Sequence, residues 1–170
     1  EIAQIRQEAT KGDASETGLI RFLTPILMKE FGGPIDVKKT ENALEEIREM
    51  HPTTMSIDGT PNEIPFSSTI KFNLIIRDMN KKKEPQTAAD NVTVFIKGAP
   101  EKVLLRVSNI IVKDINGNMV TQPYDKAIEF ETDAANSRFG LMGERVLAFS
   151  YVELDPVRFP KSGDKAYQYD

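Results

Sequence analysis

Positions 92–101 read Val-Thr-Val-Phe-Ile-Lys-Gly-Ala-Pro-Glu, which predicts a strand that turns directly into a helix. The first six positions alternate with the period of two typical of a β-strand. Gly98 then permits a close backbone approach, and Pro100 lies where the first turn of a helix tolerates proline. The alternation puts Lys97 on the same face as Phe95, at the end of a buried strand. A lysine there is better explained by an anion or polar ligand, although a surface lysine after a turn is the alternative.

A second run, residues 70–77, reads Ile-Lys-Phe-Asn-Leu-Ile-Ile-Arg and alternates in the same way. A polar loop over residues 79–90 separates the two runs, so we expect them to pair as antiparallel neighbours. The three lysines of this loop, residues 81–83, are interpreted as its solvated face.

The remaining chain supplies helices and a hairpin. Apolar residues recur at helical spacing in residues 2–9, 19–27, 38–50, 103–111 and 125–139. In the last of these, we expect Ala127, Phe130 and Ala134 to face inward. Asn116-Gly117 predicts a type I′ hairpin between residues 110–112 and 119–120, and residues 146–152 predict a buried strand. The order of elements predicts a single α/β (α+β) domain over residues 1–170, with helices on a mainly antiparallel sheet.

Composition excludes several classes of site. Lys and Arg total 22 and Asp and Glu total 26, so the net charge is −4, and no basic block indicates nucleic-acid binding. Cys is absent and His51 is the only histidine, which excludes disulfides and thiolate metal sites and argues against a Ser-His-Asp triad within these residues. No apolar run approaches the ~18–20 residues that cross a bilayer. The first residues read as a helix joined partway along, so we expect a segment of a larger cytosolic region.

Three more stretches carry candidate site residues, each with a plainer alternative. Residues 12–16, Gly-Asp-Ala-Ser-Glu, open a helix, where Asp13 can cap and Glu16 can reach back in a capping box. Phe66 follows Pro65 at an irregular start to the first central strand, where it is either a core aromatic or a partly exposed platform for a base. Arg145 precedes the last strand and either forms a surface ion pair or holds phosphate oxygens through two parallel hydrogen bonds.

None of these signals is specific alone, because the chain has no Walker loop, dinucleotide glycine fingerprint or kinase catalytic set. Together and in this order, the four stretches resemble the nucleotide-binding (N) domain of P-type cation-transporting ATPases, most of all the sodium/potassium and proton/potassium pumps. They are residues 12–16, residues 64–71 (Ile-Pro-Phe-Ser-Ser-Thr-Ile-Lys), residues 97–101 (Lys-Gly-Ala-Pro-Glu) and residues 143–147 (Gly-Glu-Arg-Val-Leu). The resemblance covers essentially the whole chain.

This resemblance implies an ATP site whose contacts are mainly to adenine. Phe66 would stack on the base, and Glu16 would accept a hydrogen bond from its exocyclic amine. Lys97 would lie deep at the base end, and Gly98 would allow close approach of the nucleotide. Asp13 would be the turn and cap residue that positions Glu16.

Further residues would complete the pocket by the same resemblance. Lys71 would line it, Arg145 would reach the phosphate side, and Leu147 would pack on the nucleotide. Ala99 and Pro100 would be structural residues at the site, and Ser150 would fall near the pocket wall. Asn73 stands where the sodium/potassium pumps usually have Gln, and Phe72 where they usually have Tyr. Residues 51–62 are longer than the pump pattern and are expected to form an extended turn outside the pocket.

In the intact pump, the resemblance implies, this domain holds ATP and carries it to an aspartate in the phosphorylation domain, alongside the actuator domain. The Asp-Lys-Thr-Gly-Thr motif of that aspartate does not occur in these residues, so we expect ATP binding without turnover, no catalytic or metal-ligating residue, and Mg²⁺ only in the intact pump. We expect a monomer without direct membrane contact. The alternatives are an N domain of another subgroup, such as fungal-type sodium pumps or calcium pumps, and a non-catalytic interaction module.

Overall fold

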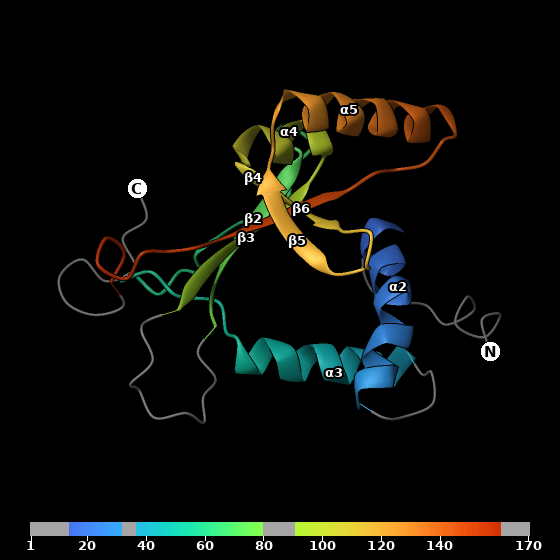
Figure 1. Ribbon diagram of the computed structural model, residues 1–170. Coiled ribbons are helices and arrows are strands. Elements are labelled where there is room, and N and C mark those ends of the chain that lie inside the picture. Colours follow the sequence, from blue (N-terminus) through green and yellow to red (C-terminus); the bar gives the residue numbers. More distant parts are fainter. Residues whose placement is uncertain (1–13, 32–36, 80–90, 161–170) are drawn as a thin grey trace. The chain divides into compact units, whose positions relative to one another are not determined.

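A computed structural model describes residues 14–31, 37–79 and 91–160 of the chain (Figure 1). The chain divides into two compact units, Glu1–Pro52 with Lys81–Lys83 and Thr53–Asn80 with Glu84–Asp170. The predicted helix over residues 2–9 and the loop lysines 81–83 lie outside the described residues.

The second unit is built on a four-stranded antiparallel sheet of order β1-β2-β3-β6, of which β2, β3 and β6 are labelled in Figure 1. Its strands are β1 (Glu63–Ile64), β2 (Phe72–Asp78), β3 (Val92–Gly98) and β6 (Ala148–Glu153). The pairing of β2 with β3 confirms the predicted antiparallel neighbours. Strand β2 begins at Phe72 and not at residue 70, where the alternating run starts. The reason is that Lys71 has a φ of 61°, which interrupts the extended backbone. Likewise, β6 begins at Ala148, two residues later than expected.

The register divides the sheet into two faces. One row across β2, β3 and β6 contains Asn73, Lys97 and Phe149, so these three side chains share a face. The opposite face carries the buried core residues Ile76 and Ile96. Because side chains alternate between faces along a strand, Asn73 and Lys97 lie on the face opposite these core residues.

The turn after β3 leads into a shorter helix than the sequence predicted. Helix α4 (Pro100–Val103) begins with a buried proline, contacts β3 and β6, and ends in a 3₁₀ turn, η1 (Leu104–Arg106). The expectation of one helix through Ile111 is wrong, since Ile111 belongs to β4 (Asn109–Lys113). Residues 103, 104, 107 and 111 fit helical spacing, but the β-branched run at 110–112 pairs as a strand instead.

The predicted hairpin is confirmed, but its turn is of another type. Strand β4 pairs with β5 (Met119–Pro123) in a two-stranded antiparallel sheet. Gly117 has a φ of 86°, whereas Asn116 has no positive φ, and a type I′ turn requires both. The amide of Gly117 donates to the Asp114 carbonyl at 3.0 Å, which gives a wider turn with the glycine in the left-handed region.

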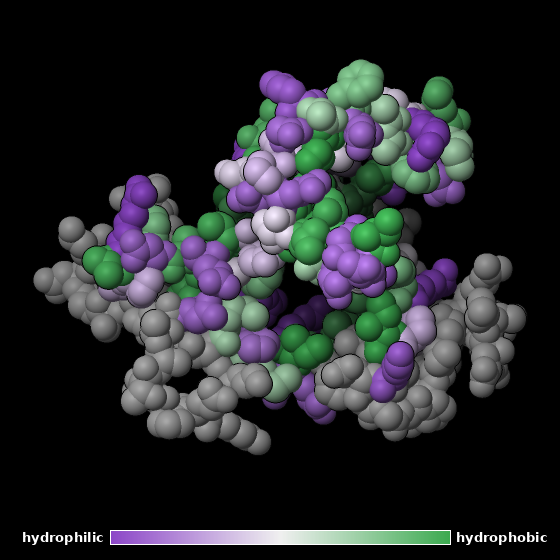
Figure 2. All heavy atoms as spheres, viewed as in Figure 1, coloured by the Kyte–Doolittle hydropathy of each residue, from purple (hydrophilic) through white to green (hydrophobic). Residues whose placement is uncertain are grey.

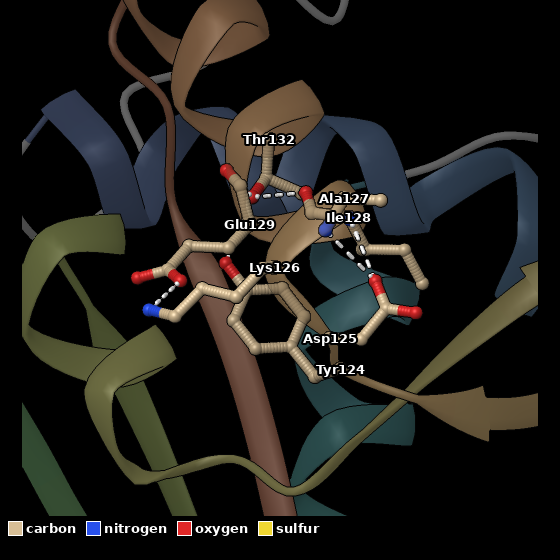
Figure 3. A network of polar contacts seen from close by, with 7 residues as sticks. All are labelled: Tyr124, Asp125, Lys126, Ala127, Ile128, Glu129 and Thr132. Carbon is tan, nitrogen blue, oxygen red and sulfur yellow. Dashed lines mark hydrogen bonds and ion pairs between the residues drawn. The ribbon is translucent and has the colours of Figure 1, made fainter.

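Helix α5 (Lys126–Leu141) begins at an aspartate cap. The carboxylate of Asp125 accepts from the amides of Ala127 and Ile128 at 3.0 Å each (Figure 3). The Thr132 hydroxyl lies 2.8 Å from that of Tyr124 and so faces the preceding loop. The polar side of α5 that carries Thr132 therefore faces Tyr124.

The predicted inward face of α5 is therefore wrong. Ala127, Phe130 and Ala134 are exposed, Phe130 to 76%, and Figure 2 shows apolar atoms on the surface over this helix. The half-buried positions are Ile128, Glu129, Thr132, Ala135 and Asn136. Helical spacing predicts that a face exists but not which face is buried.

The described residues of the first unit form two helices. Helix α2 (Ala14–Phe31) continues through Pro25, and α3 (Val37–Met50) ends two residues before Pro52. That end agrees with the expectation that Pro52 closes the helix. The hydroxyl of the buried Thr24 donates to the Ile20 carbonyl at 2.8 Å. The two helices contact one another.

We predict that the Asp114 carboxyl titrates below its ordinary pKa. It accepts from the amide of Asn118 at 2.8 Å, which is the largest cause, and from the amide of Asn116 at 2.9 Å, and these bonds favour the ionised form. Because the folded pKa is lowered, this stabilisation is present above the unfolded pKa of ~3.9 and is lost as pH falls through the folded value. Carboxyl NMR titration tests this, and a midpoint at or above the ordinary value contradicts it.

Candidate functional site

The predicted site residues of the second unit gather at one end of the four-stranded sheet. There β2 begins, β3 ends and β6 begins, so residues far apart in the sequence become neighbours. Asn73 pairs directly with Lys97, and both side chains are half-buried. Directly opposite pairs in antiparallel strands hold their Cβ atoms about 4.5–5.5 Å apart, within reach of one ligand.

Gly98 lies against the chain's own backbone. A Cβ built on it would meet the Lys71 carbonyl oxygen at 2.5 Å and the Phe72 Cβ at 2.5 Å. No other residue fits without movement, because real Cβ atoms do not approach heavy atoms so closely. The close approach at Gly98 is therefore to the turn before β2, and its approach to a nucleotide stays a prediction.

Lys71 occupies a strained position at this end of the sheet. Among the described residues, it is the only one other than glycine with a positive φ. Its amide donates to the Ser67 carbonyl at 2.8 Å, and its own carbonyl accepts from the Ala99 amide at 2.9 Å. The Lys71 Nζ lies 3.4 Å from Glu101 Oε1, with both side chains 53% exposed. Non-glycine residues in this conformation cluster at functional sites.

Asn73 carries a polar atom that no described residue satisfies. Its Oδ1 is buried and has no hydrogen-bond partner in the described part of the chain. Leaving such an acceptor unpaired costs about 1–3 kcal/mol, and groups of this kind call for an explanation such as a ligand or an ion. The neighbouring Lys97 makes a polar or anionic ligand suitable at this place.

Phe66 lies in the irregular segment between β1 and β2, and its side chain is 61% exposed. The exposure agrees with the interpretation of a partly exposed aromatic rather than a core residue. The next residue, Ser67, accepts the amide hydrogen of Lys71 through its carbonyl, which ties the Phe66 segment to the start of β2.

Arg145 and Leu147 precede β6 at the same end of the sheet. Gly143, with a φ of 77°, ends the turn after α5, and an irregular stretch then leads to Ala148, the partner of Gly98. Arg145 is exposed and Leu147 is half-buried. Ser150 pairs with Ile96 and so lies on the other face of the sheet from Lys97.

The helix start at residues 12–16 belongs to the other unit. Helix α2 begins at Ala14, but Asp13 and the side chain of Glu16 lie outside the described residues. Their roles stay predictions. Ala99 and Pro100 are the cap and first residue of α4, and the backbone of Ala99 has φ −61° and ψ 134°.

Two residues at this end of the sheet were missed by sequence reasoning. Phe149 is the third member of the row with Asn73 and Lys97, and it is 59% exposed. The alternation of residues 146–152 predicts which residues share a face with Phe149, but it does not predict that their strand pairs with β3. Glu101 was visible in its motif, but its partner Lys71 is 30 residues away in the sequence.

The described residues contain no group of three or more acidic or histidine side chains that could hold a metal ion. Within those same ranges, no helix is long and apolar enough to cross a membrane.

Comparison with known proteins gives the family. Residues 1–170 match the model of the family described as P-type ATPase, cytoplasmic domain N. The chain belongs to this family. The match confirms the resemblance, the α+β fold with its antiparallel sheet and the expectation of a cytosolic domain.

The relatives of this N domain include much longer transport proteins. It is 33% identical over 165 residues to potassium-transporting ATPase alpha chain 2 of Rattus norvegicus, covering 95% of the N domain and 13% of the relative. It is 32% identical over 162 residues to sodium/potassium-transporting ATPase subunit alpha of Hydra vulgaris, covering 95% and 12%. It is 29% identical over 161 residues to sodium/potassium-transporting ATPase subunit alpha-2 of Gallus gallus, a match that covers 95% of the N domain and 13% of the relative. The chain thus spans about an eighth of the length of these relatives.

We predict that Gly98→Ala destabilises the N domain by about 1–3 kcal/mol, because the added methyl group must displace backbone at Lys71. Gly140→Ala is the matched control, since a Cβ there meets nothing within 4 Å in an exposed helix and is expected to be neutral or stabilising by ~0.5–1 kcal/mol. Denaturant unfolding of the two variants measures the difference. Equal stabilities would show that the contact is not tight.

We also predict that Lys71→Gly is more stable than Lys71→Met by about 1 kcal/mol. Both variants lose the ion pair with Glu101, but only glycine relieves the positive φ. The difference between their denaturant midpoints, provided that the two variants unfold with the same m-value, measures the strain of the positive φ at residue 71. A methionine variant as stable as the glycine variant would contradict this account of Lys71.

Proposed function

We propose that the N domain binds ATP weakly, mainly through its adenine, at the end of the sheet where Asn73 and Lys97 pair. The observation that carries the proposal is the buried, unpaired Oδ1 of Asn73 beside a half-buried lysine. The exocyclic amine of adenine would reach this oxygen only after the Asn73 side chain turns outward, since the oxygen is buried. The family to which the chain belongs supports the same ligand.

The aromatic side chains support adenine as the part that is held. Phe66 is exposed next to the turn that ends at Lys71, and stacking of a base on such a ring contributes about 1–3 kcal/mol. Leu147 lies beside the same end of the sheet and would pack against the base or ribose.

The charged residues suit the phosphates. Lys71, Lys97 and Arg145 come from three segments that meet at one end of the sheet. Lys71 and Arg145 would hold the phosphate oxygens by charge-assisted hydrogen bonds, whereas Lys97 would lie at the base end. Mg²⁺ would be bound only in the larger protein.

Affinity should be low. One stack and a few charge-assisted hydrogen bonds, at about 1.5–3 kcal/mol each, oppose an association cost of about 4 kcal/mol or more. The difference corresponds to a Kd of roughly 0.1 mM to several mM. Because adenine supplies most contacts, ADP and AMP should bind nearly as well as ATP.

In the larger protein, the N domain would present ATP to the phosphorylation domain of the same chain for transfer to an aspartate. The relatives are named as potassium-transporting and sodium/potassium-transporting ATPases, which favours an ATP-driven cation pump of that subgroup over fungal-type sodium or calcium pumps. The N domain itself would bind ATP without turnover, as a monomer, and without contacting nucleic acid or the membrane.

We predict that backbone amides near Phe66, Lys71, Lys97 and Arg145 shift saturably when ATP is titrated into an isotope-labelled sample followed by two-dimensional NMR. Phe66→Ala should weaken binding by about 5- to 150-fold, the equivalent of a lost stack. Phe130→Ala is the matched control, because Phe130 is also an exposed phenylalanine but lies on α5.

Three outcomes would contradict the proposal. Amides that stay still at several millimolar ATP would favour the non-catalytic interaction module. An unchanged affinity in Phe66→Ala would place the base elsewhere. A strong preference for ATP over ADP would show that the phosphates, and not adenine, supply most of the binding.

A further inference from the structure

We propose that Glu101 sets how strongly the N domain discriminates between nucleotides of different phosphate number, by competing with the phosphates for Lys71. This inference rests on the proposed function and assigns a positioning role to Glu101, a motif residue to which the proposed function gives no role. The competing group is the carboxylate of Glu101, which lies 3.4 Å from the Lys71 Nζ.

The backbone at both ends of this pair is fixed. Lys71 is held by Ser67 and Ala99 through two backbone hydrogen bonds of 2.8 and 2.9 Å. Glu101 is the second residue of α4, and the preceding Pro100 is buried. The Ala99 that binds the Lys71 carbonyl is also the cap residue of α4, so one short connection positions both partners. The pair therefore depends on the site's own backbone and not on a flexible surface loop.

Both side chains remain accessible, which makes the pair exchangeable. Each is 53% exposed, and exposed pairs of this kind are weak enough for another anion to replace one partner. A nucleotide phosphate is such an anion. While Glu101 holds Lys71, the cation contributes less to binding a phosphate.

The carboxylate changes the charge at this end of the sheet. Glu101 pairs with Lys71 and so places a negative charge at the end of the sheet to which Lys97 and Arg145 also belong. Its removal raises the local positive charge by one without altering the aromatic or amide contacts to the base. We therefore expect the effect to grow with the negative charge of the ligand and to vanish for adenosine.

The test compares the wild-type N domain with Glu101→Gln for binding of ATP, AMP and adenosine by NMR titration at two ionic strengths. We expect ATP to bind about two- to five-fold more tightly in Glu101→Gln, AMP to gain less, and adenosine to be unchanged. The gain for ATP should shrink at the higher ionic strength, since exposed charges are screened by salt.

Glu129→Gln is the matched control. Glu129 also pairs with a lysine, Lys126, on an exposed helix, so the substitution changes net charge and ion-pair number equally but on α5. It should leave all three affinities unchanged. A gain of the same size in Glu129→Gln would assign the effect to net charge and overturn the proposal.

A double variant completes the experiment. Lys71→Met with Glu101→Gln should bind ATP no more tightly than Lys71→Met alone, because Glu101 acts through Lys71. Equal gains for ATP and adenosine, or no gain for ATP, would overturn the role of Glu101. Wild-type protein that binds neither adenosine nor ATP would overturn the proposed function itself, so the two failures are distinguishable.

Discussion

The distance between β3 and the turn before β2 depends on the absence of one methyl group. At Gly98 the Lys71 carbonyl and the Phe72 side chain come so close that a Cβ has no room. This contact lets the Ala99 amide reach the Lys71 carbonyl and fixes where α4 begins. The left-handed backbone of Lys71 and its ion pair with Glu101 lie at the same turn, next to the paired Asn73 and Lys97.

Much of this arrangement can be read from the sequence where a pattern has a single structural solution. The alternation at residues 92–97 and its neighbour over 70–77 predicted the central pair of strands, and Asn116-Gly117 predicted a hairpin. Other patterns have two solutions. The spacing of Val103, Val107 and Ile111 fits a helix as well as a turn followed by a strand, and Asn-Gly fits two turn types. Tertiary packing decides between them, and local residues do not.

The site was predicted in parts. The resemblance assigned Phe66, Lys71, Asn73 and Lys97 to the site, and these roles stay predictions. The structure places Asn73 beside Lys97 because their strands pair. The positive φ of Lys71 could not be predicted from residues 68–71, Ser-Thr-Ile-Lys, because this stretch contains no glycine. Phe149 and Glu101 could not be assigned partners, because the register between distant segments and the contact across a turn arise only on folding.

The order of strands also has a consequence for how the chain folds. Strands β2 and β3 are consecutive along the sequence, whereas β6 reaches β3 only after α4, the β4–β5 hairpin and α5 have been made. Closing the longer connection costs more chain entropy, so a sheet pairing of this kind forms more slowly than a local one. In the row from Asn73 to Phe149, the Asn73–Lys97 pair thus comes from the neighbouring strands β2 and β3. Phe149 joins the row from β6, which is distant in the sequence. A nascent chain that has not yet extended past Ala148 would carry the Asn73–Lys97 pair with an open strand edge beside it, the kind of surface on which unrelated chains aggregate.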